Sequence, residues 1–246
     1  MILFIVEGGI VMYDTIIFDL DDTLTDDRAN IKEAFKILMN TIGDEFKEEN
    51  FNRFYKIDKQ TWKDRATGKL VSPYEDNKEK KTEWVRSYRF REYYNNEITY
   101  DESVHMSNIY TEGMKEIVVP RKYCYEIIKY LYDKGYKIII ATNGPLIPLV
   151  TKLKKLDIYK FIHTFFAAEE VGFMKPNPKY YEGLFKKANI DASNKILFIG
   201  DDLEKDIKGG IDNNLDTCWC NYKNEKNELY DTKFEIHSLD ELKEIL

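Results

Sequence analysis

Four polar clusters in this 246-residue chain contain side chains that can do chemistry, and each follows a short apolar run. The clusters are Asp19-Leu20-Asp21-Asp22-Thr23, Thr142-Asn143-Gly144, Lys175-Pro176 and Gly200-Asp201-Asp202, with Asp206 one turn after the last. Together they supply carboxylates, a hydroxyl, an amide and an ammonium. Loops that only connect elements would not be expected to select those groups four times. The clusters are therefore candidates for one shared site.

The carboxylates in these clusters need a cation. Buried carboxylates that gather in one place repel one another unless a positive charge joins them. An all-oxygen ligand set with few protein ligands favours magnesium over zinc or copper. Magnesium also keeps water molecules and accepts the oxygens of a substrate phosphate. The clusters thus predict a Mg²⁺ site that suits phosphoryl transfer.

Strands and single helices alternate through most of the chain, and this alternation would bring the clusters together. Apolar runs typical of buried strands lie at 15–18, 137–141, 164–167, 195–199, 216–220 and 234–236. Helical spacing lies at 123–134, 146–156, 179–188 and 204–213, and 238–241 has the pattern of a capping box that opens a last helix. Strands joined by single helices form parallel sheets, whose ligands bind beyond the carboxyl ends of the strands. The pattern predicts an α/β fold, a Rossmann-like doubly wound parallel sheet, with the clusters at one edge.

A charged and aromatic segment interrupts this alternation after the first cluster. Helical spacing at 30–42, 51–64, 78–94 and 102–114 predicts a helical insert over 27–115. The predicted core domain then comprises 12–26 and 116–246. Residues 1–11 are predicted to be a non-native or disordered extension, because Glu7-Gly8-Gly9 before Ile10-Val11-Met12 is how a ribosome-binding site would read if translated.

Composition excludes some partners. The formal net charge of −7 provides no general attraction to nucleic acids or anionic membranes, so any phosphate must be held locally. The cysteines form no C-x-x-C pair and are expected to be reduced, buried thiols: Cys124, Cys218 and Cys220. The histidines are too dispersed for a triad or a zinc site and are expected to be structural: His105, His163 and His237. We expect a cytoplasmic monomer that acts on a small-molecule phosphate ester, with no nucleic acid polymer and no membrane as partner.

Four segments match, in order and spacing, the motifs of one enzyme family. They are Phe18-Asp19-Leu20-Asp21-Asp22-Thr23-Leu24-Thr25, Thr142-Asn143-Gly144, Lys175, and Gly200-Asp201-Asp202-Leu203-Glu204-Lys205-Asp206. On these motifs the chain resembles the haloacid dehalogenase (HAD) superfamily over its whole predicted core. The resemblance implies that the helical insert is a C1-type cap, which closes over the site, excludes water and reads the leaving group.

The resemblance also implies how the reaction would run. Asp19 attacks phosphorus and becomes an aspartyl phosphate, which divides one difficult displacement into two. Asp21 protonates the leaving oxygen and then deprotonates the attacking water. Lys175 neutralises Asp19 and the phosphate.

Further residues are assigned to binding by the same resemblance. Mg²⁺ would be bound by the side chain of Asp19, the backbone carbonyl of Asp21 and the side chain of Asp201. Phosphoryl oxygens would be held by Thr142, by the backbone around Asn143 and by Lys175, with help from the following helix N-terminus. Asp202 and Asp206 would orient these groups.

The substrate is indicated less directly. Asp21 favours phosphate chemistry, because haloacid dehalogenases proper lack an acid/base aspartate two residues after the nucleophile. Segments 209–211, 215–221, 234–236 and 239–242 resemble bacterial nucleoside 5′-monophosphate phosphatases that act on pyrimidine nucleotides. The insert departs from that subgroup around 72–81, so a sugar-phosphate phosphatase, as in relatives that act on acylneuraminate 9-phosphate, or a phosphomutase is the alternative. A non-catalytic binding protein is a third hypothesis, and the retained carboxylates argue against it.

Each candidate also has a plainer interpretation. Residues 19–23 and 142–144 could be ordinary turns, and Lys175 could be a surface lysine; the four clusters together outweigh these interpretations. Some arginines of the insert could donate to a base or sugar, or could lie on a solvated helix face: Arg65, Arg86, Arg89 and Arg91. The aromatic residues of the insert are expected mostly to pack between helices and not to form a base-stacking platform, with one or two of them facing the substrate: Trp62, Trp84, Tyr88, Tyr93 and Tyr94.

Overall fold

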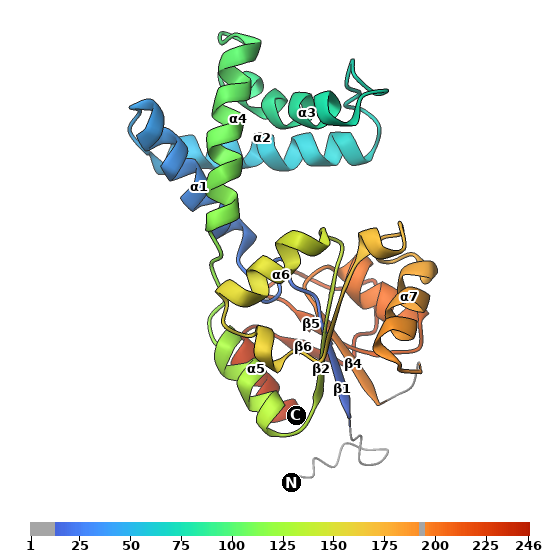
Figure 1. Ribbon diagram of the computed structural model, residues 1–246. Coiled ribbons are helices and arrows are strands. Elements are labelled where there is room, and N and C mark those ends of the chain that lie inside the picture. The colour runs from blue at the N-terminus through green and yellow to red at the C-terminus, as the bar shows by residue number, and fades with distance from the viewer. Residues whose placement is uncertain (1–12, 192–194) are drawn as a thin grey trace. The chain divides into compact units, whose positions relative to one another are not determined.

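A computed structural model describes residues 13–191 and 195–246 (Figure 1). Within these, the chain forms two compact units: a sheet unit, residues 13–26 and 118–246, and a helical unit, residues 27–117. The expected insert, 27–115, ends two residues earlier than the helical unit. The expectation that residues 1–11 are an extension falls outside the described residues.

The sheet unit contains one six-stranded parallel sheet with the order β3-β2-β1-β4-β5-β6. The strands are β1 (Thr15–Phe18), β2 (Lys137–Thr142), β3 (Thr164–Ala167), β4 (Ile196–Gly200), β5 (Asp216–Cys220) and β6 (Phe234–Ile236). β2 pairs with one side of β1, and β3 then pairs with β2. The next strand in the chain, β4, pairs with the other side of β1. The strand order therefore reverses beside β1, and ligands of such sheets bind at this point. The predicted α/β fold class is confirmed.

Helices cover both faces of the sheet (Figure 1). Ile16 and Phe18 belong to the core on the face covered by α5 (Cys124–Asp133) and α6 (Leu146–Lys155). Ile17, between them in β1, belongs to the core on the opposite face, under α7 (Pro178–Ala188). Because strand side chains alternate between faces, a strand buried on both sides is apolar throughout. Burying each such side chain contributes about 1.5–3 kcal/mol.

Two segments of the sheet unit differ from the predicted helices. The expected helix at 204–213 is a π-helical turn, η3 (Leu203–Lys208), followed by α8 (Gly209–Asp212). Its first turn is wide because the carbonyl of Asp202 accepts from the backbone N–H groups of both Asp206 and Ile207, at 2.9 and 3.3 Å. The turn carries Asp206, which the site uses.

The predicted capping box at 238–241 is wrong. The hydroxyl of Ser238 donates to the carboxylate of Asp240, and the carboxylate of Glu241 accepts from the backbone N–H of His237 at 3.1 Å. The chain therefore ends in two short elements, η4 (Leu239–Glu241) and α9 (Leu242–Ile245), instead of one capped helix.

All regular elements of the helical unit are helices. They are α1 (Asp27–Ile42), α2 (Glu48–Ala66), α3 (Lys78–Tyr93) and α4 (Tyr100–Glu116). Their shared core is rich in aromatic rings, and the rings of Phe35 and Phe54 stack with centroids 4.7 Å apart. A capping box of Thr99 and Glu102 begins α4. Of the described helices, none is both long enough and apolar enough to span a bilayer.

Candidate active site

Lys175 joins two buried carboxylates at the carboxyl edge of the sheet. Its Nζ lies 2.6 Å from Asp19 Oδ1, 2.7 Å from Asp206 Oδ1 and 3.0 Å from the carbonyl oxygen of Ala141. The side chains of Lys175 and Asp206 are each 2% exposed, and that of Asp19 is 8% exposed. Lysine is almost never buried this deeply unless it is paired. The interpretation of Lys175 as a surface lysine is therefore wrong.

The surrounding elements fix these three residues. Asp19 directly follows β1, and its backbone N–H donates to the carbonyl of Ile199 in β4 at 2.9 Å. The loop that carries Lys175 is held by the side chain of Asn143, whose Oδ1 accepts from the Lys175 N–H at 2.7 Å and whose Nδ2 donates to the Lys175 carbonyl at 3.2 Å. Asn143 thus uses its side chain to hold the lysine loop.

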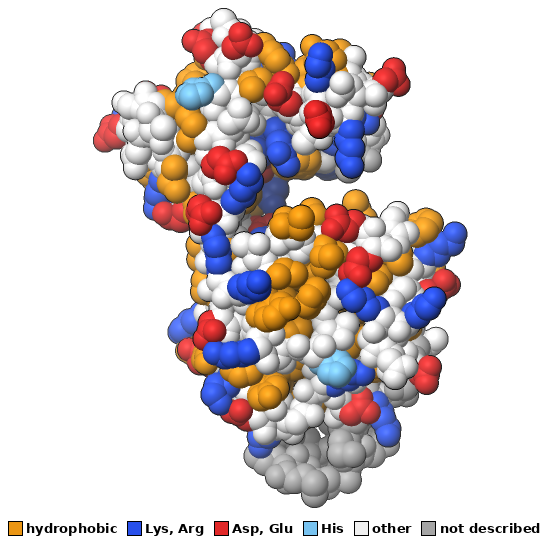
Figure 2. Space-filling model, viewed as in Figure 1, with side chains coloured by type: hydrophobic (Ala, Val, Ile, Leu, Met, Phe, Trp, Pro, Cys, Tyr) orange, Lys and Arg blue, Asp and Glu red, His pale blue; other side chains and the backbone are white. Residues whose placement is uncertain are grey.

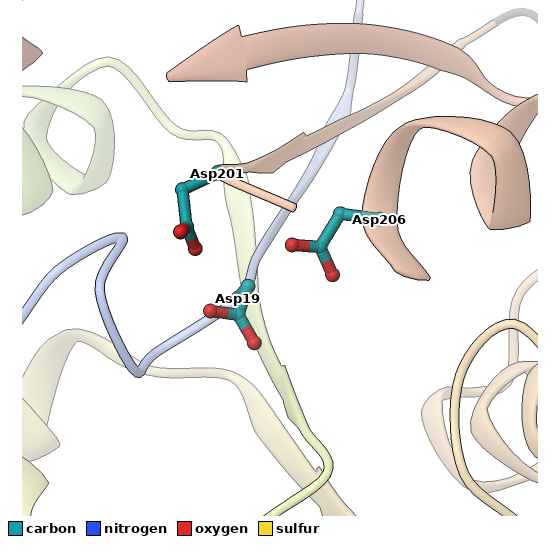
Figure 3. Close-up of side chains that lie close together, drawn as sticks. All are labelled: Asp19, Asp201 and Asp206. Atoms are coloured by element: carbon teal, nitrogen blue, oxygen red, sulfur yellow. The ribbon is translucent and has the colours of Figure 1, made fainter. Parts of the chain in front are cut away.

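Three carboxylates gather at this edge, as Figure 3 shows. One oxygen from each of Asp19, Asp201 and Asp206 lies within 4.8 Å of the others. Asp201 is oriented by the hydroxyl of Thr23, which donates to Oδ1 at 3.0 Å. Oxygen donors without sulfur or imidazole suit a hard cation such as Mg²⁺. The donor set therefore fits the predicted metal.

Asp206 is the least free of the three to bind a metal. Its Oδ1 accepts from Lys175 Nζ, and its Oδ2 accepts from the backbone N–H of Asp202 at 3.1 Å. With both oxygens engaged, Asp206 is suited to holding Lys175 in place, which is the orienting part expected of it.

Burial shifts the pKa values of the site. Burial raises the pKa of Asp19 well above its usual value, the charge of Lys175 opposes this, and Asp206, Asp201 and Asp21 add to it. Burial, with repulsion from Asp206, raises the pKa of Asp201 to about 7. Burial acts to lower the pKa of Lys175, but Asp19 and Asp206 outweigh it, and the pKa lies well above its usual value. Lys175 therefore stays positively charged. A second cation beside these carboxylates would further stabilise their ionised forms.

Asp21 is held by two side chains from the β2–α6 segment. The hydroxyl of Thr142 donates to Asp21 Oδ2 at 3.3 Å and accepts from the backbone N–H of Gly144 at 2.9 Å. The ammonium of Lys152, in α6, pairs with Asp21 Oδ1. The structure thus brings Thr142 to Asp21, and it adds Lys152, which the motifs did not indicate.

Asp202 lies at the edge of the cluster. Its Oδ1 accepts from the backbone N–H groups of Glu204 and Lys205 at 3.1 and 2.9 Å, and its Oδ2 pairs with the ammonium of Lys205. Burial acts to raise the pKa of Asp202, but the bonds from Lys205 and Glu204 lower it on balance. Asp202 caps η3 and so fixes the turn that carries Asp206.

Arg121 is a second residue that the motifs did not indicate. Its Nη1 donates to Asp26 Oδ2 at 2.7 Å, and its Nη2 donates to Asp22 Oδ1 at 3.3 Å. Its guanidinium lies over the ring of Tyr222, 4.7 Å from the centroid. Arg121 thereby connects residues 19–26, here called the nucleophile loop, to the segment that follows the helical unit. Thr25 of the loop and Pro120 of that segment form an isolated β-bridge.

The candidate residues of the helical unit separate into different environments. The guanidinium of Arg89 is buried and pairs with Asp58. Arg89 therefore neither lies on a solvated helix face nor is available to donate to a substrate. Arg65 pairs with Glu75 at 3.1 Å, and Arg86 is exposed. Arg91 lies over the rings of Trp84, Tyr88 and Tyr100. Trp62 is 44% exposed and does not pack fully between helices.

Charged side chains of both signs lie on the surface of each unit. Figure 2 shows Lys and Arg side chains interspersed with Asp and Glu over the visible face of each unit. The Nδ1 of His237 contacts the carbonyl oxygen of Asn221 at 2.9 Å.

Comparison with known proteins identifies one family. A family model described as haloacid dehalogenase-like hydrolase matches residues 13–213. The HAD-hydrolase YfnB of Bacillus subtilis is 27% identical over 236 residues, which cover 95% of each chain. The pyrimidine 5′-nucleotidase YjjG of Escherichia coli is 27% identical over 237 residues, which cover 95% of this chain and 98% of that protein.

Solved structures agree with the fold. A crystal structure of YfnB from Bacillus subtilis, bound to magnesium, superimposes with a TM-score of 0.80 at 26% identity and covers 96% of this chain and 99% of that one. The match extends over both units of the chain.

Proposed function

Because the chain belongs to the haloacid dehalogenase-like hydrolases, as its motifs predicted, we propose that it is a Mg²⁺-dependent phosphomonoester hydrolase with Asp19 as its nucleophile. The single observation that carries this proposal is the buried contact of Lys175 Nζ with Asp19 Oδ1 at 2.6 Å. The contact holds one oxygen of a carboxylate at the switch point of the sheet and leaves the other to attack.

The first half of the reaction forms a bond between Asp19 and phosphorus. The oxygen of Asp19 that does not contact Lys175 attacks the phosphoryl group, and the ester oxygen leaves with a proton from Asp21. Lys175 offsets the negative charge of Asp19 and of the phosphoryl oxygens throughout. In the second half, Asp21 takes a proton from water, which attacks phosphorus and releases Asp19. Two easier displacements replace one difficult one.

Mg²⁺ would be held by the side chains of Asp19 and Asp201 and by the backbone carbonyl of Asp21. When bound, it would supply positive charge that stabilises the phosphoryl oxygens and lowers the repulsion among the carboxylates. The raised pKa of Asp201, caused first by burial, supports a cation at this position. The related YfnB, bound to magnesium in its crystal structure, also supports it.

The phosphoryl oxygens would be held by Thr142, Lys175 and the backbone around Asn143, next to the N-terminus of α6. Asn143 contributes through its backbone because its side chain holds the loop of Lys175. Asp202 and Asp206 keep their expected orienting part: Asp202 fixes the turn and Asp206 fixes the lysine.

The substrate that we propose is a nucleoside 5′-monophosphate of the pyrimidine type. Two relatives named pyrimidine 5′-nucleotidases support it. They are YjjG of Escherichia coli and PynA of Streptococcus pneumoniae, and PynA is 24% identical over 237 residues that cover 96% of each chain. The helical unit would act as the cap that reads the leaving group. We further propose a cytoplasmic monomer, and the buried free cysteines support a reducing compartment.

A sugar-phosphate substrate is the second candidate. Residues 72–81 are the part of the helical unit that departs from the nucleotidase subgroup, and Glu75 there binds both Arg65 and Lys81. A phosphomutase would return the phosphoryl group to its substrate and would release little phosphate.

The test is phosphate release from a panel of nucleoside monophosphates and sugar phosphates. The wild-type protein should release phosphate in the presence of Mg²⁺. EDTA should abolish this activity, and added Mg²⁺ should restore it. The Asp19→Asn variant should be folded but inactive. Preference for pyrimidine monophosphates would support the nucleotide substrate, and preference for sugar phosphates would replace it. Activity that ignores EDTA or survives Asp19→Asn would refute the mechanism.

A further inference from the structure

Lys152 of α6 reaches the acid/base aspartate from a helix that carries none of the family motifs. Its ammonium pairs with Oδ1 of Asp21, although the two residues are 131 positions apart in the chain. The side chains are 21% and 33% exposed, so the pair lies at the rim of the site.

The stem of Lys152 is fixed by its helix. Leu149 and Leu153 of α6 are 1% and 0% exposed and belong to the core between α6 and the sheet. Lys152 is three residues after Leu149, which places the two on the same side of α6, and Leu153 follows Lys152 directly. The ammonium is therefore presented from a rigid element.

The two oxygens of Asp21 are held unequally. Oδ1 has the charged partner, and hydrogen bonds to ionised donors are shorter and stronger than neutral ones. Oδ2 has only the hydroxyl of Thr142, at the long distance of 3.3 Å. Oδ1 is thus the anchored oxygen, and Oδ2 is the oxygen that can exchange a proton.

We propose that Lys152 is a positioning residue that holds the carboxyl group of Asp21 for proton transfer to the leaving oxygen. The proposal rests on the proposed function, in which Asp21 is the general acid and base. A carboxyl group that rotates freely is seldom aligned with the leaving oxygen, and alignment governs the rate of such transfers. Anchoring Oδ1 keeps Oδ2 directed at the reacting atoms.

The proton balance of the step is closed without Lys152. As the Asp19–phosphorus bond forms and the ester bond breaks, the proton on Asp21 passes to the leaving oxygen. When water attacks phosphorus, its proton returns to Asp21 and the Asp19–phosphorus bond breaks. The sum is ester plus water to alcohol plus phosphate, and Lys152 keeps its protons throughout.

The leaving group supplies a sharp test. An alkoxide needs a proton in order to leave, whereas p-nitrophenolate leaves without one. The value of kcat/KM reports the steps up to release of the leaving group. Lys152→Met should therefore lower kcat/KM for an alkyl phosphate that wild type hydrolyses at least about tenfold more than for p-nitrophenyl phosphate. The aryl ester also shows whether the variant is folded.

Three further variants complete the design. Lys152→Arg should recover part of the loss on the alkyl ester. Lys154→Met, an equal change of charge at an exposed position of α6, should match wild type on both esters. In an Asp21→Asn background, Lys152→Met should add little, because the carboxyl group that Lys152 positions for proton transfer is already absent.

Equal losses on the two esters, no loss on either, or an undiminished loss in the Asp21→Asn background would overturn the proposal. These results are distinct from failure of the proposed function, in which wild type itself would hydrolyse neither ester with Mg²⁺.

Discussion

The carboxylate of Asp206 fills the space in which a side chain of Gly200 would stand. A β-carbon added to Gly200, the last residue of β4, would lie 2.4 Å from the Cβ, Cγ and Oδ2 atoms of Asp206. Real contacts are never this close, and Asp206 is 1% exposed, so it has no room to retreat. Glycine at this position is what allows Asp206 to reach Lys175.

Gly200→Ala should therefore impair the site by displacing Asp206. We expect the overpacking to lower the free energy of unfolding by about 1–3 kcal/mol, and we expect kcat to fall because Lys175 loses one of its two carboxylate partners. Urea denaturation and steady-state phosphate release measure the two effects. Gly113→Ala in α4 is the matched control, since its β-carbon would meet atoms no nearer than 3.6 Å. Full activity in Gly200→Ala would contradict the account.

Lys175→Met should both inactivate and destabilise the protein. The change leaves Asp19 and Asp206 buried without their cation, and breaking a buried pair in this way costs about 3–5 kcal/mol. Lys179→Met, an exposed lysine of α7, should change the free energy of unfolding by no more than about 0.5 kcal/mol. Chemical denaturation of both variants makes the comparison. A Lys175→Met protein as stable as the control would show that the pair does not hold the site together.

Arg89 should prove to be a structural residue of the helical unit. Its guanidinium pairs with Asp58, donates to the carbonyl of Arg86 at 3.1 Å and lies 4.5 Å from the ring centroid of Tyr110. Arg89→Met should lower the free energy of unfolding by about 3–5 kcal/mol, because Asp58 is left buried and unpaired. Arg86→Met, at an exposed position of α3, should have an effect within about 0.5 kcal/mol. Equal stability of the two variants in urea would count against this assignment.

The three cysteines should be inert in the folded protein. Burial raises the pKa of Cys124 to about 12, and it raises the pKa values of Cys218 and Cys220 as well. A thiol whose pKa lies far above the working pH stays protonated, and the thiolate is the reactive form. At pH 8 a thiol reagent should therefore modify almost none of the native thiols and all three after denaturation. Rapid modification of the native protein would mean that α5, which carries Cys124, or β5, which carries Cys218 and Cys220, opens readily.

Much of the fold could be predicted because its signals are local. Ile16, Ile17 and Phe18 form an apolar run typical of a strand buried on both faces, and single helices between such runs indicate a parallel sheet. The site followed from that topology, since Asp19 and Asp201 directly follow β1 and β4, and Thr142 is the last residue of β2.

Other features depend on contacts between distant parts of the chain and left no local signal. Lys152 and Arg121 look like ordinary surface residues until α6 and the segment after the helical unit are placed beside the nucleophile loop. The π-helical turn at 203–208 arises from two N–H groups that share the carbonyl of Asp202, which no spacing of side chains reveals. The capping pattern at 238–241 failed because neither side chain makes the bond that the box requires: the hydroxyl of Ser238 donates to Asp240, and the carboxylate of Glu241 accepts from the backbone N–H of His237 and not from that of Ser238.

The central claim is that Asp19 is phosphorylated during turnover, and trapping that intermediate tests it most directly. The enzyme would be quenched in acid while it hydrolyses a phosphate ester with Mg²⁺, treated with borohydride to reduce any acyl phosphate, and mapped by peptide mass spectrometry. The account predicts reduction at Asp19 alone, lost when hydroxylamine is added before the borohydride and absent from Asp19→Asn. An active enzyme that shows no modified carboxylate, or one at another residue, would contradict it.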